Sequence, residues 1–299
     1  MRPAVPTPSP VFRFAPTPNG ALHLGHAYSA LCNRRLADET GGRLLLRIED
    51  LDRTRCKPAY EAAILDDLAW LGVHFDGAPR RQSEHGDDYA SALGRLEAMD
   101  LVYPCFCSRA EAARAAIGRD PDGAPLYAGA CRGLTIAQRR VRLQRGDKAA
   151  WRLDMRRAVG FAARPIAWLE YGEGATGEPR AADPEAWGDV VLRGRDLVAS
   201  YHLAVTVDDA VQGVTDVVRG RDLLAATAVH RLLQELLGLP APRYRHHRLV
   251  RDPGGDKLSK SRGSPSLAGL RAQGATAETI RRALGFAGEG DPEVSVALS

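Results

Sequence analysis

The stretch RFAPTPNG (residues 13–20), with HLGH (residues 23–26) shortly after it, establishes the order of the first elements. The apolar run at residues 11–14 predicts a strand, the prolines and the Asn-Gly pair predict a turn, and the composition after the second motif predicts a helix. Residues 43–48 then predict a second strand, and residues 58–71 predict a second helix. This alternating order implies an α/β fold with a parallel sheet and ligands at the carboxyl ends of its strands.

The HLGH motif predicts an anion site. Its position between a turn and a helix places backbone N–H groups and the positive end of the helix dipole beside two imidazoles, His23 and His26. Gly25 carries no side chain, so a nucleotide can approach the backbone there. The alternative is that the two histidines only cap or pack against the helix.

The segment KLSKS (residues 257–261) predicts a second phosphate-binding feature. It offers the ammonium groups of Lys257 and Lys260 and the hydroxyls of Ser259 and Ser261, and it follows a segment that contains Gly254 and Gly255. The chain has 41 basic residues, only four of which are lysine, and two of these four lie in this segment. A compact, flexible cation is therefore favoured here over arginine, as in phosphate sites that use a point charge.

The later part of the chain shows three further patterns. Residues 201–207 and 214–218 are rich in β-formers, residues 223–237 have the spacing of an amphipathic helix, and residues 244–250 predict a strand that leads into the lysine segment. Between residues 105 and 132 the pattern breaks into Gly, Pro, Asp and Cys, which predicts an insertion.

Composition excludes several classes of protein. With 299 residues, 44% of them hydrophobic, the chain can bury a sizeable core. No window approaches the ~18 unbroken apolar residues of a membrane helix, and the proline-rich start lacks the order of a signal peptide, so we expect a cytoplasmic protein.

The formal net charge is only +4, but residues 132–157 carry a local basic surplus that suits a polyanion such as RNA, although charge runs are more often solvated faces.

Taken together, the motifs resemble those of the glutamyl branch of the class I aminoacyl-tRNA synthetases. The resemblance covers residues 12–261 and rests on HLGH, KLSKS and three further segments: RIEDLD (residues 47–52), YHLA with VDD (residues 201–209) and VVRGRDLL (residues 217–224). Within that branch the chain is similar to the short glutamyl-queuosine tRNA(Asp) synthetases.

The resemblance implies a doubly wound, Rossmann-type catalytic domain with a zinc-bearing insertion. On this basis we expect residues 11–102 and 189–262 to be the two halves of the nucleotide-binding domain. Residues 103–188 would form the insertion, with an acceptor-type subdomain, and residues 263–299 a short helical tail.

The resemblance also implies an amino-acid pocket formed by Arg13, Phe14, Ala15, Pro16, Thr17, Glu49, Tyr201 and Arg219. Chemistry agrees, because a substrate with two carboxylates and one ammonium matches two arginine forks, one acid and a hydroxyl donor. Glutaminyl relatives carry an uncharged residue at the position of Arg219, so Arg219 is the expected discriminator for glutamate. Taken singly, each of these charged residues would be interpreted as part of a surface salt bridge.

The expected ATP-binding residues are His23, Gly25, His26, Lys257, Ser259 and Lys260. Among them, His23, His26 and Lys260 are the expected catalytic residues. They would stabilise the phosphoryl group as the α-carboxylate of glutamate attacks ATP, with magnesium accompanying the nucleotide.

Three cysteines in the insertion suggest a zinc site. Cys105, Cys107 and Cys131 supply three soft ligands, one fewer than a closed tetrahedral structural site needs. The short relatives complete the site with a tyrosine four residues before the last cysteine, and Tyr127 has that spacing. The alternative is a set of buried free thiols with Tyr127 in the core.

The tail after the lysine segment is short. Residues 262–299 predict two short helices, at residues 266–273 and 277–284, whereas an anticodon-reading domain needs ~100 residues. The short relatives instead esterify glutamate onto queuosine at the wobble position of tRNA(Asp), so ATP, L-glutamate and queuosine-modified tRNA(Asp) are the expected partners of a monomer. A truncated glutamyl-tRNA synthetase that charges an acceptor end and an inactive tRNA-binding paralogue are the two alternatives.

Overall fold

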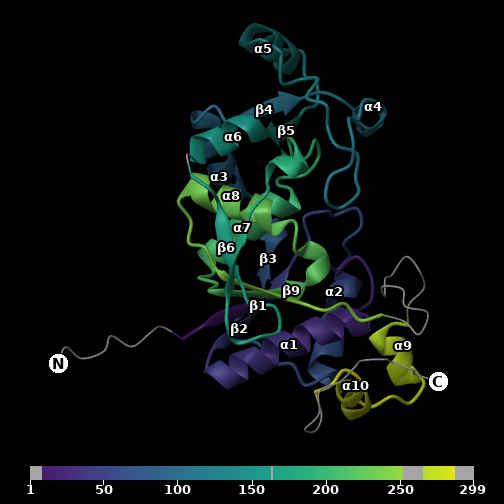
Figure 1. Ribbon diagram of the computed structural model, residues 1–299. Coiled ribbons are helices and arrows are strands. Elements are labelled where there is room, and N and C mark those ends of the chain that lie inside the picture. Colours follow the sequence, from purple (N-terminus) through teal and green to yellow (C-terminus); the bar gives the residue numbers. More distant parts are fainter. Residues whose placement is uncertain (1–8, 163, 252–264, 287–299) are drawn as a thin grey trace, which may run out of the picture.

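The computed structural model describes residues 9–162, 164–251 and 265–286. Its lower part in Figure 1 is a parallel unit in which the first three strands pair side by side, in the order β1-β2-β3. The elements are β1 (Val11–Phe14), α1 (Leu24–Thr40), β2 (Arg43–Ile48), α2 (Pro58–Trp70) and β3 (Arg80–Arg81). The predicted alternation of strand and helix and the parallel pairing are confirmed.

A second group of parallel strands lies beside β1, although it comes from the far end of the sequence. The backbone N–H of Thr215 donates to the carbonyl oxygen of Val11 at 3.0 Å, which places the start of β9 next to β1. β9 (Asp216–Gly220) and β10 (Arg243–His247) pair in parallel, and α8 (Thr227–Leu237) connects them. The predicted amphipathic helix therefore begins at Thr227, after a short 3₁₀ turn, rather than at Leu223.

Between these two groups the chain builds an antiparallel sheet, drawn at the top of Figure 1. β5 pairs on one side with β4 and on the other with β8. The elements are α3 (Gly86–Ala98), β4 (Val102–Cys105), α4 (Arg109–Arg114), α5 (Ile136–Gln144), β5 (Ala150–Leu153), α6 (Met155–Ala162) and β8 (Val191–Arg193).

A hairpin returns the chain from this region to the parallel strands. β6 (Ala167–Glu170) pairs antiparallel with β7 (Glu178–Ala181) and parallel with β10. This strand lies within residues 103–188, and the domain boundaries expected from the sequence stay a prediction.

The prediction of β-structure at residues 201–207 is wrong, because this segment is the start of helix α7 (Tyr201–Val211). The side chain of Ser200 caps the helix by accepting from the backbone N–H of Leu203. The β-branched residues that suggested a strand are buried on several faces of the helix, so tertiary packing overrides their local preference. The short tail forms the two predicted helices, α9 (Leu267–Ala272) and α10 (Ala277–Ala283).

The tail helices belong to the core of the parallel unit. Leu267 and Ile280 are fully buried, and they pack in one cluster with Phe12 of β1 and Leu22 before α1. None of the helices in the described part of the chain combines the length and the apolarity needed to cross a membrane.

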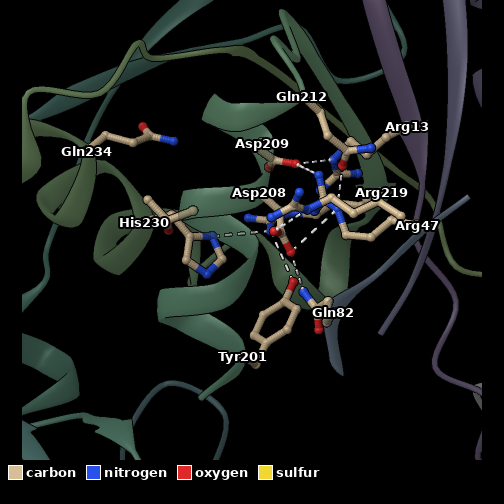
Figure 2. Close-up of polar contacts among 12 residues, drawn as sticks. Arg13, Arg47, Gln82, Tyr201, Asp208, Asp209, Gln212, Arg219, His230 and Gln234 are labelled. Atoms are coloured by element: carbon tan, nitrogen blue, oxygen red, sulfur yellow. Dashed lines mark hydrogen bonds and ion pairs between the residues drawn. The ribbon is translucent and has the colours of Figure 1, made fainter. Parts of the chain in front are cut away.

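A network of buried charges joins the parallel strands to α7 (Figure 2). Asp208 has no exposed surface and accepts hydrogen bonds from Arg80 Nε at 2.8 Å, Gln82 Nε2 at 2.8 Å and the Tyr89 hydroxyl at 3.0 Å. A carboxylate satisfied in this way stabilises the fold only while all of its partners remain in place.

We expect Asp208→Asn to lower the free energy of unfolding by about 3 kcal/mol, because the neutral amide leaves buried arginine charge uncompensated. Asp38→Asn is the control: Asp38 forms an exposed ion pair with Arg34 within α1, and its loss should cost less than about 1 kcal/mol. Urea denaturation of both variants measures the difference. Equal, small losses would contradict a structural role for the Asp208 network.

Candidate active site

The two histidines of the HLGH motif lie together at the start of α1. His23 Nδ1 accepts from the backbone N–H of Gly25 at 3.1 Å, and His26 Nδ1 accepts from the backbone N–H of His23 at 3.2 Å. Their ring centroids are 3.9 Å apart. The capping alternative is thus seen in the structure, and it does not exclude a catalytic role, because both rings also line the cavity described below.

The position of the His23 ring leaves no room for a side chain at residue 25. A Cβ atom at this position would lie 2.9 Å from Cε1 of His23, which is closer than carbon atoms approach in proteins. The missing side chain therefore makes room for the His23 ring over the helix start. The predicted approach of a nucleotide to the same backbone remains a prediction.

A cavity of about 540 Å³ lies at the ends of four strands, and many of the residues predicted to bind glutamate and ATP line it. It is lined by residues at or after the carboxyl ends of β1, β2, β9 and β10, as expected for a parallel sheet. All eight residues expected in the amino-acid pocket line it, and so do the three HLGH residues expected to bind ATP: Arg13, Phe14, Ala15, Pro16, Thr17, His23, Gly25, His26, Glu49, Tyr201 and Arg219.

The second ATP signature cannot be placed in the same way. Lys257, Ser259 and Lys260 lie outside the described residues. The residues that flank their segment do lie at the site: Val250 lines the cavity, and Ser266 forms a β-bridge with His23. The backbone N–H of Leu267 also donates to the carbonyl oxygen of Leu22 at 2.8 Å.

The guanidinium of Arg219, at the cavity wall, donates hydrogen bonds to acceptors on all sides (Figure 2). It is buried, with 5% of its surface exposed, and all five of its N–H groups have acceptors. The acceptors are His246 Nε2 at 3.1 Å, Tyr201 Oη at 3.3 Å, His230 Nδ1 at 3.2 Å, the Leu223 carbonyl at 3.2 Å and Thr227 Oγ1 at 2.8 Å.

None of these partners carries a negative charge. Within residues 9–162, 164–251 and 265–286, no carboxylate forms an ion pair with Arg219. A buried cation without a counter-ion is costly, and it attracts an anion that enters the cavity. The charge of Arg219 is thus available to a ligand, although its hydrogen-bond donors are already oriented by the protein.

Arg13 differs from Arg219 in having an internal counter-ion. Its Nε donates to Asp209 Oδ1 at 3.0 Å, and the same carboxylate accepts from Arg47 (Figure 2). Burial alone raises the pKa of Asp209, but Arg13 and Arg47 outweigh it, so the pKa lies below its ordinary value. Arg13 lines the cavity as predicted, with part of its charge already compensated.

Glu49 follows β2 and is half-buried at the cavity wall. Burial raises its pKa to about 7, against the opposing effect of the Arg47 and Arg13 cations. In the part of the chain that the structure describes, its carboxylate forms no salt bridge. Glu49 is therefore an acid that a cationic group in the cavity would stabilise in its ionised form.

The four predicted metal ligands converge in the insertion. The sulfur atoms of Cys105, Cys107 and Cys131 lie within 4.8 Å of one another. The Tyr127 hydroxyl lies 3.3 Å from the sulfur of Cys105 and 3.6 Å from that of Cys107, and it accepts from the backbone N–H of Cys131 at 2.9 Å. Three of the four side chains are buried, so the arrangement also accommodates the alternative of packed free thiols.

Cations surround this cluster. The guanidinium of Arg152 lies 3.9 Å from the centre of the Tyr127 ring, and that of Arg142 lies 4.1 Å from the centre of the Phe106 ring. Thiolate ligands would make a zinc site of this composition anionic, and neighbouring arginines offset such charge. The donor set and its surroundings thus fit a zinc ion.

Sequence reasoning assigned no role to several polar residues beneath the cavity. Asp209 fixes Arg13, whereas His230 and His246 fix Arg219. Asp208 and Asp209 follow an apolar segment directly, and two adjacent acids in such a position are a signal of buried charged residues. His230 stands in an equally apolar stretch of α8, where a buried histidine needs a partner.

The geometry can be compared with known proteins. The family described as "tRNA synthetases class I (E and Q), catalytic domain" matches residues 11–294. The chain belongs to this family. It is a ligase of the class I aminoacyl-tRNA synthetase type, and the resemblance expected from the sequence is confirmed.

Among its relatives is a protein of Rhodobacter capsulatus named Glutamyl-Q tRNA(Asp) synthetase. The two are 45% identical over 92% of this chain and 100% of the relative. A protein of the same name from Symbiobacterium thermophilum is 42% identical over 90% of this chain and 83% of its own length. The Glutamate--tRNA ligase 2 of Syntrophus aciditrophicus is 36% identical over 93% of this chain and 57% of that protein.

Among solved structures, the glutamate-tRNA synthetase of Elizabethkingia anophelis is similar in fold. Its TM-score is 0.75 at 28% identity, over 92% of this chain and 61% of that structure. The chain thus has the class I synthetase catalytic fold, with a parallel sheet and flanking helices, as the sequence predicted.

Proposed function

We propose that this ligase activates L-glutamate with ATP, without tRNA, and transfers the glutamyl group to queuosine at the wobble position of tRNA(Asp). In the first step an oxygen of the glutamate α-carboxylate attacks the α-phosphorus of ATP, and the bond to the bridging oxygen breaks. Pyrophosphate leaves and glutamyl-adenylate forms. In the second step a hydroxyl of queuosine attacks the acyl carbon, and AMP leaves.

The observation that carries this proposal is a pair of opposite charges that face one cavity without ion-pair partners in the described part of the chain. Arg219 supplies a buried cation for the side-chain carboxylate, and Glu49 supplies an anion for the substrate ammonium. Tyr201 adds a hydroxyl beside Arg219, and burial raises its pKa, so it remains a hydrogen-bond donor. Glutamine, which lacks the second carboxylate, would leave the Arg219 charge uncompensated.

Arg13 completes the pocket in this proposal, with its position fixed by Asp209. It would face the α-carboxylate, the group that reacts. Phe14, Ala15, Pro16 and Thr17 would shape the wall beside it, since the chain passes directly from β1 through these residues to the turn.

His23, His26 and Lys260 are the proposed catalytic residues, and Gly25, Lys257 and Ser259 would bind ATP with them. The two imidazoles stand at the positive end of α1, where the helix dipole favours a phosphate. Magnesium bound to ATP would offset further phosphate charge. These groups would stabilise charge that develops on the phosphoryl oxygens in the transition state.

The relatives support the queuosine acceptor. Several proteins that are 38–45% identical over most of this chain carry the name Glutamyl-Q tRNA(Asp) synthetase. The relative named Glutamate--tRNA ligase 2 favours a second candidate function, in which glutamate is charged onto an acceptor end.

Two assays on the purified chain test the proposal. We expect pyrophosphate exchange with glutamate in the absence of tRNA, and we expect labelled glutamate to accumulate on tRNA(Asp) that contains queuosine but not on the same tRNA without it. Absence of exchange at any glutamate concentration would disprove the first step. Equal labelling of both tRNAs would favour the acceptor-end alternative.

Glutamate binding should depend on pH through Glu49. The pKa of about 7 in the free protein means that Glu49 is ionised above that pH, and a bound ammonium favours the ionised form. We therefore expect the KM for glutamate to rise by up to about tenfold per pH unit as the pH falls below 7, and to level off above it. The glutamate side chain titrates near pH 4.3 and contributes little in this range.

Exchange kinetics between about pH 6 and pH 8 measure this dependence. Glu49→Gln is the control, because it keeps the shape of the side chain and removes the titrating group. The variant should show a higher KM that no longer changes with pH. A variant that retains the pH dependence would assign it to another group.

We further propose that Cys105, Cys107, Cys131 and Tyr127 hold one structural zinc ion. Bound zinc would crosslink the end of β4 and the residues just after it, at Cys105 and Cys107, to the loop that precedes α5; between these segments the described chain forms the short helix α4. Its contribution would be to the folding of the insertion rather than to the reaction at the distant cavity.

Metal analysis of the purified protein should find about one zinc per chain, because three thiolates and a phenolate complete a tetrahedral site. Cys105→Ser should lose the metal and destabilise the insertion. Cys56→Ser serves as the matched control, since Cys56 lies outside the cluster and should leave the zinc content unchanged. Zinc-free wild-type protein that folds normally would favour the free-thiol alternative.

A further inference from the structure

Two imidazoles, of His230 and His246, contact the guanidinium of Arg219, and a third, of His202, contacts His230; the hydrogen bonds fix their tautomers. Arg219 can only donate, so His230 Nδ1 must accept and the ring proton must be on Nε2. That nitrogen lies 3.2 Å from His202 Nδ1, which therefore accepts in turn. On the other side, His246 Nε2 accepts from Arg219 Nε, so its Nδ1–H donates to Glu170 at 2.6 Å.

All three rings are neutral. Burial lowers the pKa of His230 well below its ordinary value, and the charge of Arg219 lowers it further. The same two causes lower the pKa of His202 to about 4. Burial also lowers the pKa of His246, in spite of its bond to Glu170. A neutral ring next to Arg219 orients the guanidinium without neutralising it.

The charge of the side chain at position 230 would act directly on the guanidinium of Arg219. His230 Nδ1 lies 3.2 Å from the same Arg219 nitrogen that contacts the Tyr201 hydroxyl (Figure 2), and both Arg219 and Tyr201 line the cavity. A carboxylate in place of the His230 ring would form a buried ion pair with Arg219 and cancel its attraction for an anionic ligand. His230 itself is 2% exposed and does not line the cavity.

We propose that His230 is a specificity-determining positioning residue: as a neutral acceptor, with its ring held in place by a hydrogen bond to His202, it aims Arg219 at the cavity and keeps its positive charge available for the substrate side chain. The proposal deepens the proposed function and rests on it for the identity of the substrate. It assigns discrimination between glutamate and glutamine to a pair, Arg219 and His230, rather than to the arginine alone.

The test uses two isosteric variants that differ in charge, His230→Gln and His230→Glu. The Gln amide oxygen supplies a neutral acceptor, so the KM for glutamate should stay within about threefold of wild type. The Glu carboxylate pairs with Arg219, so the KM for glutamate should rise by about tenfold or more with little change in kcat. The ratio of kcat/KM for glutamate to that for glutamine should fall by a similar factor only in His230→Glu.

Pyrophosphate exchange with each amino acid measures these constants, and the KM for ATP is the internal control that should not change. A role in packing alone would affect both variants alike, so equal constants for His230→Gln and His230→Glu would overturn the proposal. Wild-type protein that shows no glutamate-dependent exchange would overturn the proposed function instead, and the two failures are thereby distinguished.

A second variant covers the case in which His230→Glu does not fold, as judged by circular dichroism. His202→Leu removes the acceptor of the His230 Nε2–H group, which holds the His230 ring in place, so the KM for glutamate should rise several-fold at constant kcat. A KM equal to that of wild type would overturn the proposal.

Discussion

Two adjacent aspartates of helix α7 form ion pairs with arginines of the first parallel strands, and these ion pairs hold the strands in place relative to the helix. Asp208 and Asp209 of α7 bind arginines from three successive strands: Arg13 of β1, Arg47 of β2 and Arg80 of β3. Arginine side chains buried below a sheet need counter-ions, and the helix supplies them where the strands approach it. The cavity walls at the ends of β1 and β2 therefore take their positions relative to α7, whose first residue, Tyr201, faces the same cavity from the other side.

The same network divides the arginines of the site into two kinds. Arg13 and Arg47 share the carboxylate of Asp209, so their charges are partly spent within the protein. Arg219 is buried just as deeply, but its partners are imidazoles, a phenol, a hydroxyl and a carbonyl. The charge of Arg219 is thus not compensated by an ion pair within the described residues, and in the proposed function it would attract the side-chain carboxylate of the substrate.

The parallel sheet was predictable from sequence, because strand ends and turn prolines are local signals, whereas the residues expected in the amino-acid pocket followed from the resemblance to the glutamyl branch. The strands at Val11–Phe14 and Arg43–Ile48 have the predicted bounds. Local signals failed at Tyr201–Val211, where valines and a threonine suggested a strand. Burial of this segment against distant elements decides its conformation, and a window of a few residues does not contain that information.

The partners of the site residues were not predictable for a related reason. Arg13 and Asp209 are 196 residues apart, and His246 and Glu170 are 76 residues apart. Such pairs depend on register and on side-chain direction, which the sequence alone does not give. The three cysteines and Tyr127 were found because their spacing is short and a resemblance supplied the fourth ligand.

Within the described residues, the opposite charges of Arg219 and Glu49 at the cavity have no ion-pair partner, at a cost to stability. Glu49 lowers this cost by titrating near neutral pH, since its pKa of about 7 lets a proton replace the missing cation. Arg219 is stabilised instead by neutral acceptors, the rings of His230 and His246 and the hydroxyl of Tyr201. A zwitterion with an additional carboxylate would satisfy both groups at once. In the proposed function, binding of glutamate would therefore also relieve the cost of these uncompensated charges, so the free energies of binding of glutamate and of its neutral analogue would differ by more than hydrogen bonds to the substrate alone would give.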